Sequence, residues 1–364
     1  MLQVNKVVSK SPPRRLEWLD ILRFSAVVLV LWDHMVGEFL IAHKSDWFLN
    51  SFLNSVLFEP LAIRQSGGFL GVCIFFLISG YIIAQVIYKE SGLQFAVRRV
   101  IRIFPLLFIV SLTVWMLARM GVPGMPADAL KASLIDLIKN SFLVNWVCHP
   151  QITLVTPAWT LVIEVSFYII AITMLPFLKR SILPPVFLPI SLLATTCISI
   201  FWSRSLGNNF FLFSVSLAYL PILAVGSLFY LYESKAISFR FVVFGVLLSW
   251  IIFLKATFNI YPQFIAISID SYPISVVFAF FTFGFCYVIR NKLRSPRIIT
   301  WIALSSYSIY LWHGVIALPL QGILLPFLGF PFSLIISLIM LILISTISYN
   351  YIEKPCLRFA KKLI

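Results

Sequence analysis

The stretch that decides the fold is Trp18–Leu40, WLDILRFSAVVLVLWDHMVGEFL, which is long and apolar enough to cross a membrane. It nevertheless carries five ionisable residues: Asp20, Arg23, Asp33, His34 and Glu38. On insertion scales each such group costs about 2.5–3.5 kcal/mol at the centre of a bilayer. Groups this costly persist in a span where something uses them, so this stretch is the first candidate for a functional site.

The spacing of these residues places most of them on one side of a helix. At about 100° per residue, Arg23 and His34 fall within about 20° of one another. Asp20 and Glu38 lie within about 60° of the same line, and Asp33 points away from it. One face therefore presents an acid, a guanidinium, an imidazole and a second acid. Buried structural pairing between helices is the alternative interpretation of this stripe.

The composition of the whole chain is that of an integral membrane protein. Its 364 residues are 61% hydrophobic and 11% charged, with a mean hydropathy of +1.00. The apolar runs predict an all-α, polytopic membrane bundle of about ten transmembrane helices. We place them near 18–41, 69–88, 102–120, 158–178, 185–203, 210–231, 240–257, 272–290, 298–320 and 324–347. We expect one transmembrane domain at 18–350, between cytoplasmic tails at 1–17 and 351–364.

The net charge of +15 is explained by membrane topology. With ten spans both termini lie on one side, and 20 of the 28 Lys and Arg residues fall on that side. Seven fall on the other side, and Arg23 lies within the first span. This asymmetry on short loops predicts that both termini are cytoplasmic. The basic residues therefore give no reason to expect nucleic acid as a partner.

The cysteines and common motifs exclude several other classes. The five cysteines are scattered, which fits neither a disulfide framework nor a zinc site: Cys73, Cys148, Cys197, Cys286 and Cys356. The chain contains no P-loop, HExxH or GxSxG motif. We expect no metal.

Two further spans carry polar residues with two interpretations each. Ser79-Gly80, inside FFLISGYII (75–83), indicates either close helix packing or a ligand contact. Arg98, Arg99 and Arg102 lie at the cytoplasmic mouth of the third span. Arginines there suit a phosphate-bearing ligand, because one guanidinium group can bind two phosphate oxygens at once. Anchoring to anionic lipid explains them equally well.

Glu164 and His313 are isolated ionisable residues in later spans. Glu164, within WTLVIEVSFY (159–168), has no Lys or Arg near it in sequence and shares a helix face with Tyr168. Its partner must come from another helix, or the carboxylate faces a wet cavity or caps the start of its helix. His313, at the end of SSYSIYLWH (305–313), is a second buried imidazole. A lone histidine in such a place is more often a hydrogen-bonded core group than a catalyst.

In their order, these motifs resemble the membrane-bound acyltransferase-3 family of integral O-acyltransferases. The matching pieces are LDILRF with Arg23-x10-His34, FFLISGYII, RRVIRIFP, WTLVIEVSFY, SSYSIYLWH and the closing YIEKP. Together they cover nearly the whole chain and resemble the ten-helix form without an appended domain. The resemblance implies a bacterial inner-membrane enzyme that transfers an acyl group, most often acetyl from acetyl-CoA. The implied acceptor is a hydroxyl of a lipid-linked or extracytoplasmic glycan such as O-antigen or exopolysaccharide.

The resemblance also assigns roles to residues. His34 matches the family's essential histidine, Arg23 its paired arginine and Glu164 the acid of the fourth-span motif. The basic cluster associated with the acyl donor matches Arg98, Arg99 and Arg102. We expect the substrate to contact Ser79, Trp159, Tyr168 and His313. The chain departs from the family pattern at Val165, where a polar residue is common, and at Leu106-Leu107, where an aromatic residue often follows the proline.

Chemistry agrees with these roles. A sugar hydroxyl is a poor nucleophile, and a positioned imidazole can accept its proton as the oxygen attacks a thioester. His34 lies about 25 Å along its helix from Trp18, at 1.5 Å per residue, which is deep toward the outer side. Direct transfer assisted by His34 is the favoured mechanism, with an acyl-histidine intermediate as the variant.

A proton-coupled transporter or flippase that uses His34 and Glu164 is the alternative function, and a structural scaffold is a third. The sequence contains no internal inverted repeat, which counts against the transporter. The charges within the spans count against the scaffold.

Overall fold

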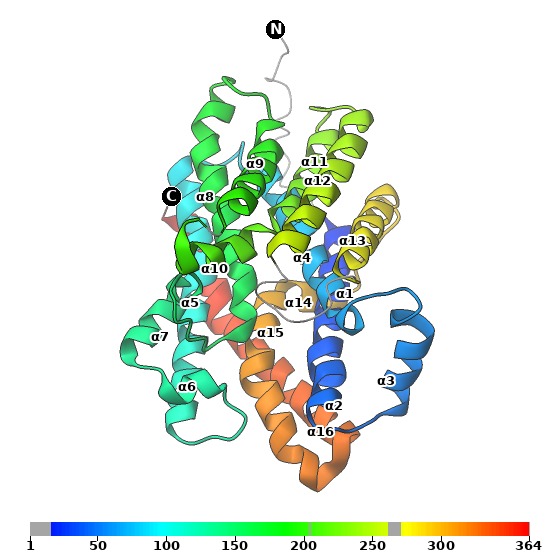
Figure 1. Ribbon diagram of the computed structural model, residues 1–364, viewed down its shortest axis with the longest axis vertical. Helices are drawn as coiled ribbons and strands as arrows, with labels where there is room; N and C mark the ends of the chain where they lie inside the picture. The colour runs from blue at the N-terminus through cyan, green and yellow to red at the C-terminus, as the bar shows by residue number, and fades with distance from the viewer. Residues whose placement is uncertain (1–15, 204, 261–270, 364) are drawn as a thin grey trace.

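The computed structural model describes residues 16–203, 205–260 and 271–363 of the chain. Helices make up 81% of the protein, and the described residues contain no strand. The expected tail at 1–17 lies almost entirely outside the described residues. Figure 1 shows long helices that run roughly along one axis, with the shorter α3, α6 and α7 gathered at the lower end. The prediction of an all-α polytopic bundle is confirmed.

The first span is not a regular helix from end to end. It begins as α1 (Glu17–Trp32), widens into a π-helical turn at Asp33–Glu38, and ends as α2 (Phe39–Ala42). A π-turn inserts an extra residue and rotates everything after it relative to a regular helix. The regular repeat of about 100° per residue, from which shared helix faces are predicted, therefore applies within α1 but not after Trp32.

The centre of the bundle is α4 (Gly68–Val86), which packs on α1, on α11 (Leu220–Glu233) and on α13 (Ser271–Val288). Two glycines let α4 and α11 touch. A Cβ on Gly80 would lie 2.0 Å from the Leu223 carbonyl oxygen, and one on Gly226 would lie 2.1 Å from the Leu77 carbonyl oxygen. The Ser227 hydroxyl also donates to the Gly80 carbonyl. Gly80 thus serves close helix packing, the first of the two interpretations of Ser79-Gly80.

The third span starts ten residues earlier than expected. Helix α5 (Gly92–Arg119) begins with a capping box in which Ser91 and Gln94 exchange side-chain-to-backbone hydrogen bonds. Because hydropathy alone excluded Arg98 and Arg99, the expected span of 102–120 was too short. Arg98, Arg99 and Arg102 are therefore helical, and Pro105 lies in the helix interior.

The other helices follow the expected order with local differences. The loop after α5 contains α6 (Ala127–Lys131) and α7 (Leu134–Ser141), and the Ser133 hydrogen bonds that cap α7 lower the pKa of Asp136. The sixth span is broken near Ala218 into α10 (Gly207–Leu217) and α11. The remaining elements up to α13 are α3 (Phe48–Leu53), α8 (Trp159–Lys179), α9 (Phe187–Trp202) and α12 (Phe239–Ile260). Short π- or 3₁₀-turns lie at Asn54–Phe58, Gln65–Gly67, Val144–Val147 and Thr156–Ala158.

The last part of the chain reverses direction at Gly329. The expected ninth span is divided at Ser305 into α14 (Arg297–Leu304) and α15 (Ser306–Trp312), followed by a π-turn at His313–Ala317. Helix α16 (Leu318–Ser348) turns back at Gly329, whose φ of 71° and ψ of 172° suit only glycine. A π-turn at Tyr349–Glu353 leads into α17 (Lys354–Lys362), which packs against α5 where a cytoplasmic tail was expected.

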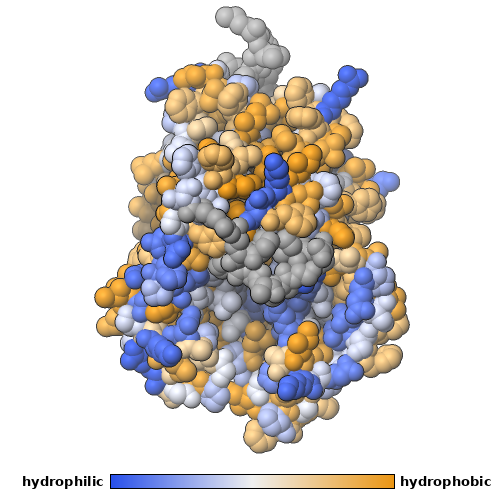
Figure 2. All heavy atoms as spheres, in the orientation of Figure 1, coloured by the Kyte–Doolittle hydropathy of each residue, from blue (hydrophilic) through white to orange (hydrophobic). Residues whose placement is uncertain are grey.

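Seven of the described segments are long and apolar enough to cross a membrane, and the segment that contains α16 doubles back at Gly329. The shorter apolar helices Phe187–Trp202 and Tyr272–Val288 fill the places of the fifth and eighth expected spans. Apolar side chains cover most of the face shown in Figure 2, and hydrophilic ones gather in its lower part. Exposed Phe244, Phe281 and Phe327 belong to this apolar surface, which suits a lipid environment.

Candidate active site

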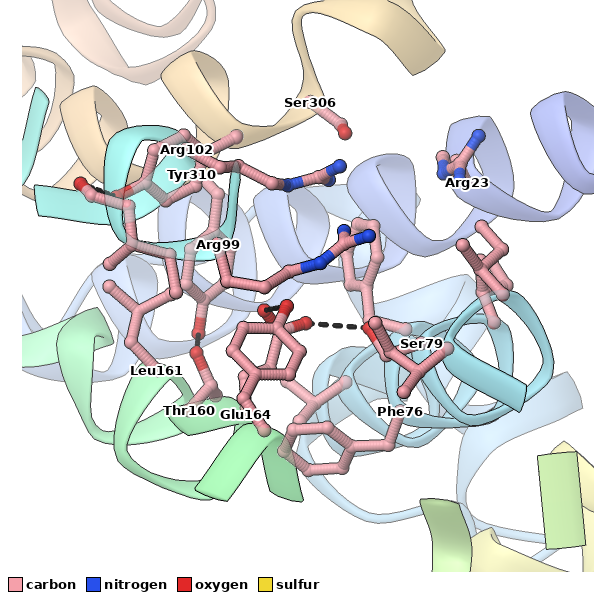
Figure 3. A pocket seen from close by; sticks show the side chains of 18 residues that line it. Arg23, Phe76, Ser79, Arg99, Arg102, Thr160, Leu161, Glu164, Ser306 and Tyr310 are labelled. Carbon is pink, nitrogen blue, oxygen red and sulfur yellow. Dashed lines mark hydrogen bonds between the residues drawn. The ribbon is translucent and has the colours of Figure 1, made fainter. Parts of the chain in front are cut away.

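A cavity inside the bundle brings together polar side chains from five helices. Its walls come from α1, α4, α5, α8 and α15, and its volume is about 90 Å³. Among its lining residues are Arg23, Ser79, Arg99, Arg102, Glu164 and Tyr168. Figure 3 shows this group from close by. Residues that lie far apart in the sequence therefore meet around one internal space.

Glu164 is held at the cavity wall by two hydroxyl groups. The Ser79 hydroxyl donates to Oε1 at 2.6 Å, and the Tyr168 hydroxyl donates to Oε2 at 2.9 Å. Ser79 comes from α4, so Glu164 finds a partner on another helix and also faces a cavity (Figure 3). Glu164 does not cap its helix, because it lies more than one turn after Trp159, the first residue of α8.

Two of the three arginines in the first half of α5 line the cavity. Figure 3 shows the Arg99 and Arg102 side chains extending in the same direction, toward the side where Arg23 lies. Arg102 forms no ion pair with any residue that the structure describes. The Arg102 side chain is exposed and lines the cavity. A guanidinium in this state is available to bind an anion.

Arg98 points elsewhere. Its guanidinium lies 2.7 Å from Glu90 Oε1, and Arg98 is absent from the cavity lining. Arg99 lies 3.6 Å from the other oxygen of Glu90 and also stacks over the rings of Phe95 and Tyr168. Arg98 and Arg102 are four residues apart, a spacing that favours one helix face, whereas the cavity receives Arg99 and Arg102.

Arg23 reaches the cavity from α1. Its guanidinium lies 3.3 Å from the carboxylate of Asp20, one turn earlier on the same helix. The cavity therefore has three guanidinium groups in its wall and a single carboxylate, that of Glu164. The electrostatic character of this space favours an anionic ligand.

The imidazole of His34 forms a direct hydrogen bond with that of His313. The two rings lie parallel, with His34 Nδ1 and His313 Nε2 2.8 Å apart. His34 lies in the π-turn of the first span, and His313 begins the π-turn after α15. Turns of this kind are frequent at functional sites. The half-buried His34 and the buried His313, 279 positions apart, thus form one unit.

The hydrogen bonds of this pair determine which nitrogen of His34 is free. His313 Nδ1 lies 2.6 Å from the Tyr310 carbonyl oxygen, which can only accept, so this nitrogen carries hydrogen. In a neutral His313 the other nitrogen, Nε2, then accepts, and His34 Nδ1 donates to it. This assignment leaves the lone pair of a neutral His34 on Nε2, the nitrogen that faces Asp33 at 3.8 Å and Glu38 at 3.9 Å.

Gln321 supports the π-turn that carries His34. The side-chain amide of this fully buried residue donates to the Met35 carbonyl at 2.9 Å. A π-turn disturbs the regular pairing of backbone groups, and a buried carbonyl needs a donor. Nothing in the sequence indicated this contact, because Gln321 lies 286 positions from Met35 in an apolar segment.

An open groove lies on the other side of His34 from the arginines. It is lined by residues of the first span, of the loop after α5 and of α16, among them His34, Glu38, His43 and Gly322. Tyr310 contributes its ring to the internal cavity and its carbonyl to His313. The His34–His313 pair therefore lies between the arginine-lined cavity and the outer groove.

Some residues differ from the expectations. Trp159 is absent from the cavity lining and packs against Phe76 and Tyr219. Thr160 and Tyr310 were not singled out from the sequence, yet both line the cavity and their hydroxyl oxygens lie 3.2 Å apart. Asp33, His34 and Glu38 bring their oxygen and nitrogen atoms within 4.8 Å of one another, a spacing that suits a hydroxyl group or a cation.

The fold and these residues define an integral membrane protein with an arginine-lined cavity and a histidine pair beside an outer groove. An acyltransferase domain profile matches residues 16–350, so the chain belongs to the membrane-bound acyltransferase-3 family. Membership of an enzyme family favours an enzyme over the transporter and the scaffold.

Two relatives agree with this placement. Over 334 residues the chain is 25% identical to "Putative peptidoglycan O-acetyltransferase YrhL" of Bacillus subtilis (strain 168), with 80% of this chain and 50% of that protein covered. Over 351 residues it is 25% identical to the O-acetyl transferase of Shigella phage Sf6, with 92% of this chain and 94% of that protein covered. The chain thus spans about half the length of the Bacillus relative. No solved structure matches the chain.

Proposed function

We propose that this protein is an O-acetyltransferase that moves an acetyl group from acetyl-CoA to a hydroxyl of a glycan, with His34 as the general base. The observation that carries the proposal is the position of His34, between the arginine-lined cavity and the outer groove. The names of the two relatives support acetyl as the acyl group.

The cavity is the proposed donor site. CoA carries phosphate groups, and Arg23, Arg99 and Arg102 supply guanidiniums that bind phosphate. The Ser79–Glu164–Tyr168 group would contact the uncharged arm of the donor and fix the cavity wall. Arg98 acts indirectly, through the Glu90 carboxylate that it shares with Arg99. Trp159 supports the α8 wall from behind.

The reaction forms one bond and breaks another. The acceptor oxygen attacks the thioester carbonyl carbon, the new C–O bond forms, and the C–S bond to CoA breaks. His34 Nε2 accepts the hydroxyl proton as the oxygen attacks and delivers it to the departing sulfur. The products are an acetyl ester and CoA with a free thiol. His313 keeps the Nε2 lone pair of His34 on the reacting side.

The reactants would arrive from opposite sides of the bacterial inner membrane. The 20-to-7 division of Lys and Arg residues supports cytoplasmic termini. On that topology the donor enters from the cytoplasm, and the groove at Glu38, His43 and Gly322 faces outward. The acetyl-bearing arm of the donor must then pass Tyr310 to reach His34. A lipid-linked or extracytoplasmic glycan such as O-antigen or exopolysaccharide is the proposed acceptor.

Mass spectrometry of surface glycans tests this proposal. Cells that contain the protein should have glycan with one added acetyl mass, and cells that lack it or contain His34→Ala should not. Release of free thiol from acetyl-CoA by the purified protein checks the donor independently. If the His34→Ala protein inserts into the membrane and still acetylates glycan, the assignment of the base is wrong.

A further inference from the structure

The outer groove differs from the internal cavity in the charges that surround it. No Lys or Arg is among the described residues that line it. Its ionisable side chains are His34, His43 and Glu38, and the side chain of Glu38 is 52% exposed. The carboxylate of Asp33 lies behind them, 3.8 Å from His34 Nε2. The groove thus presents imidazole and carboxylate groups, whereas the cavity presents guanidiniums.

His43 and Phe39 form one wall of the groove. Their rings stack with centroids 4.0 Å apart, and His43 Nδ1 lies 2.9 Å from the Phe39 carbonyl oxygen. Because that carbonyl can only accept, Nδ1 of His43 carries hydrogen, and in the neutral ring Nε2 has a lone pair. A ring stack with a polar edge matches the amphipathic surface of a sugar ring, which has apolar C–H faces and a polar rim.

The Glu38 carboxylate lies in the same part of the groove as His34, the proposed base. It lies one turn after His34 in the π-turn, with Oε2 3.9 Å from His34 Nε2. A hydroxyl oxygen bound at His34 Nε2 would therefore place neighbouring hydroxyls of the same sugar within reach of Glu38. A carboxylate accepts such hydrogen bonds strongly, because an ionised acceptor bonds about twice as strongly as a neutral one.

We propose that the groove between His34, Glu38 and His43 is the acceptor site and that it selects an uncharged saccharide. This inference rests on the proposed function. It adds the class of acceptor and the residue, Glu38, that recognises it. Glu38 accepts a hydrogen bond from a hydroxyl next to the one that reacts, and the His43–Phe39 stack supports the ring. A uronic acid or another anionic sugar is disfavoured, because its charge meets the Glu38 carboxylate, with no Lys or Arg among the described residues of the lining.

The test uses the full-length protein purified into lipid nanodiscs, with acetyl-CoA as donor. The acceptors are methyl hexopyranosides, each paired with the methyl hexuronate of the same configuration. We expect the uncharged member of a pair to have a kcat/KM at least about tenfold higher. Glu38→Gln should raise the acceptor KM about tenfold and reduce the preference for the uncharged sugar. The acetyl-CoA KM should stay unchanged, since it reports the donor site.

Glu59→Gln is the matched control, because Glu59 is an exposed glutamate in the loop before α4 that does not line the groove. It should leave every constant unchanged. If the unsubstituted protein acetylates both members of each pair equally, or if Glu38→Gln leaves the acceptor KM unaltered, the groove assignment is wrong while the proposed function stands. If acetyl-CoA remains intact with every acceptor, the proposed function fails together with the groove.

Discussion

The internal cavity and the outer groove meet at one histidine pair and have opposite chemistry. Arg23, Arg99 and Arg102 line the cavity. Each oxygen of its one carboxylate, that of Glu164, accepts a hydrogen bond from a hydroxyl group. The groove has no guanidinium in its lining and exposes Glu38. On the proposed assignment, this difference sorts the two reactants by charge, with an anionic donor on one side and an uncharged acceptor on the other.

The pair links the two regions, because His34 lines the groove and His313 is hydrogen-bonded to the carbonyl of Tyr310, which lines the cavity. His34 and His313 come from separate π-turns, and one hydrogen bond joins their rings. The arrangement fixes the direction in which His34 offers its lone pair. We therefore expect variants at the pair to affect the chemical step, and variants in the cavity or the groove to affect one reactant each.

The largest effect should come from removing the base. His34→Ala should lower kcat by about 10³-fold or more, because general base catalysis contributes about 10²–10⁴-fold. Measurement of thiol release from acetyl-CoA in the presence of acceptor checks this. His149→Ala, at an exposed outer-loop histidine, is the control and should leave kcat unchanged. Similar losses in both variants would mean that the His34 effect is not specific.

The next largest effect should separate the arginines of α5. Arg102→Ala should raise the KM for acetyl-CoA about 30-fold, the loss expected for a charged hydrogen bond to phosphate, and leave the acceptor KM unchanged. Arg98→Ala should raise it less, because Arg98 is already paired with Glu90. Steady-state kinetics with each substrate varied in turn provides the measurement. An equal effect of both substitutions would contradict the orientation of these side chains.

Removing the Gln321 amide should have a smaller effect, and on the chemical step alone. Gln321→Met keeps the length of the side chain but leaves the buried Met35 carbonyl without its donor. A lost buried hydrogen bond of about 1.4 kcal/mol corresponds to a tenfold decrease in kcat if it shifts His34. Ser333→Ala on the same helix is the control, since its hydroxyl bonds within α16. A changed KM with an unchanged kcat would contradict a role through His34.

The smallest effect should come from the boundary between the two regions. Tyr310→Phe removes a hydroxyl that lies 3.1 Å from the Pro157 carbonyl and 3.2 Å from the Thr160 hydroxyl. The carbonyl of Tyr310 that fixes His313 stays in place. We expect a decrease of about threefold in kcat/KM for acetyl-CoA, and an abolished kcat would show that the hydroxyl itself takes part in the reaction.

The sequence predicts much of this architecture because hydropathy reports burial in lipid directly. The order of the spans and the unusual charge of the first span are both visible in it. Gly329 shows where this method is limited, because its neighbours are apolar on both sides and only the backbone conformation reveals the reversal. The start of α5 was missed for a different reason. Arginines that line a cavity lower the hydropathy of a helix, so its first turns resemble a loop in the profile.

Contacts between distant residues were the part that the sequence could not provide. The regular helical repeat places Arg23 and His34 on one face, but the π-turn at Asp33–Glu38 changes the direction of everything that follows. The pairing of His34 with His313 and the bond from Gln321 to Met35 depend on packing between the first span and the last third of the chain. Trp159 illustrates the reverse error, in which a prominent aromatic residue proves to pack in the core.

A sided transfer assay tests the central claim most directly. Right-side-out membrane vesicles are loaded with acetyl-CoA that carries a labelled acetyl group, and an uncharged glycan acceptor is supplied only outside. The account predicts labelled acetyl ester on the external glycan and free CoA thiol inside the vesicles, with neither formed by the His34→Ala protein. If the glycan is labelled only when acetyl-CoA and the acceptor are supplied on the same side of the membrane, the claim of transfer across the membrane is wrong.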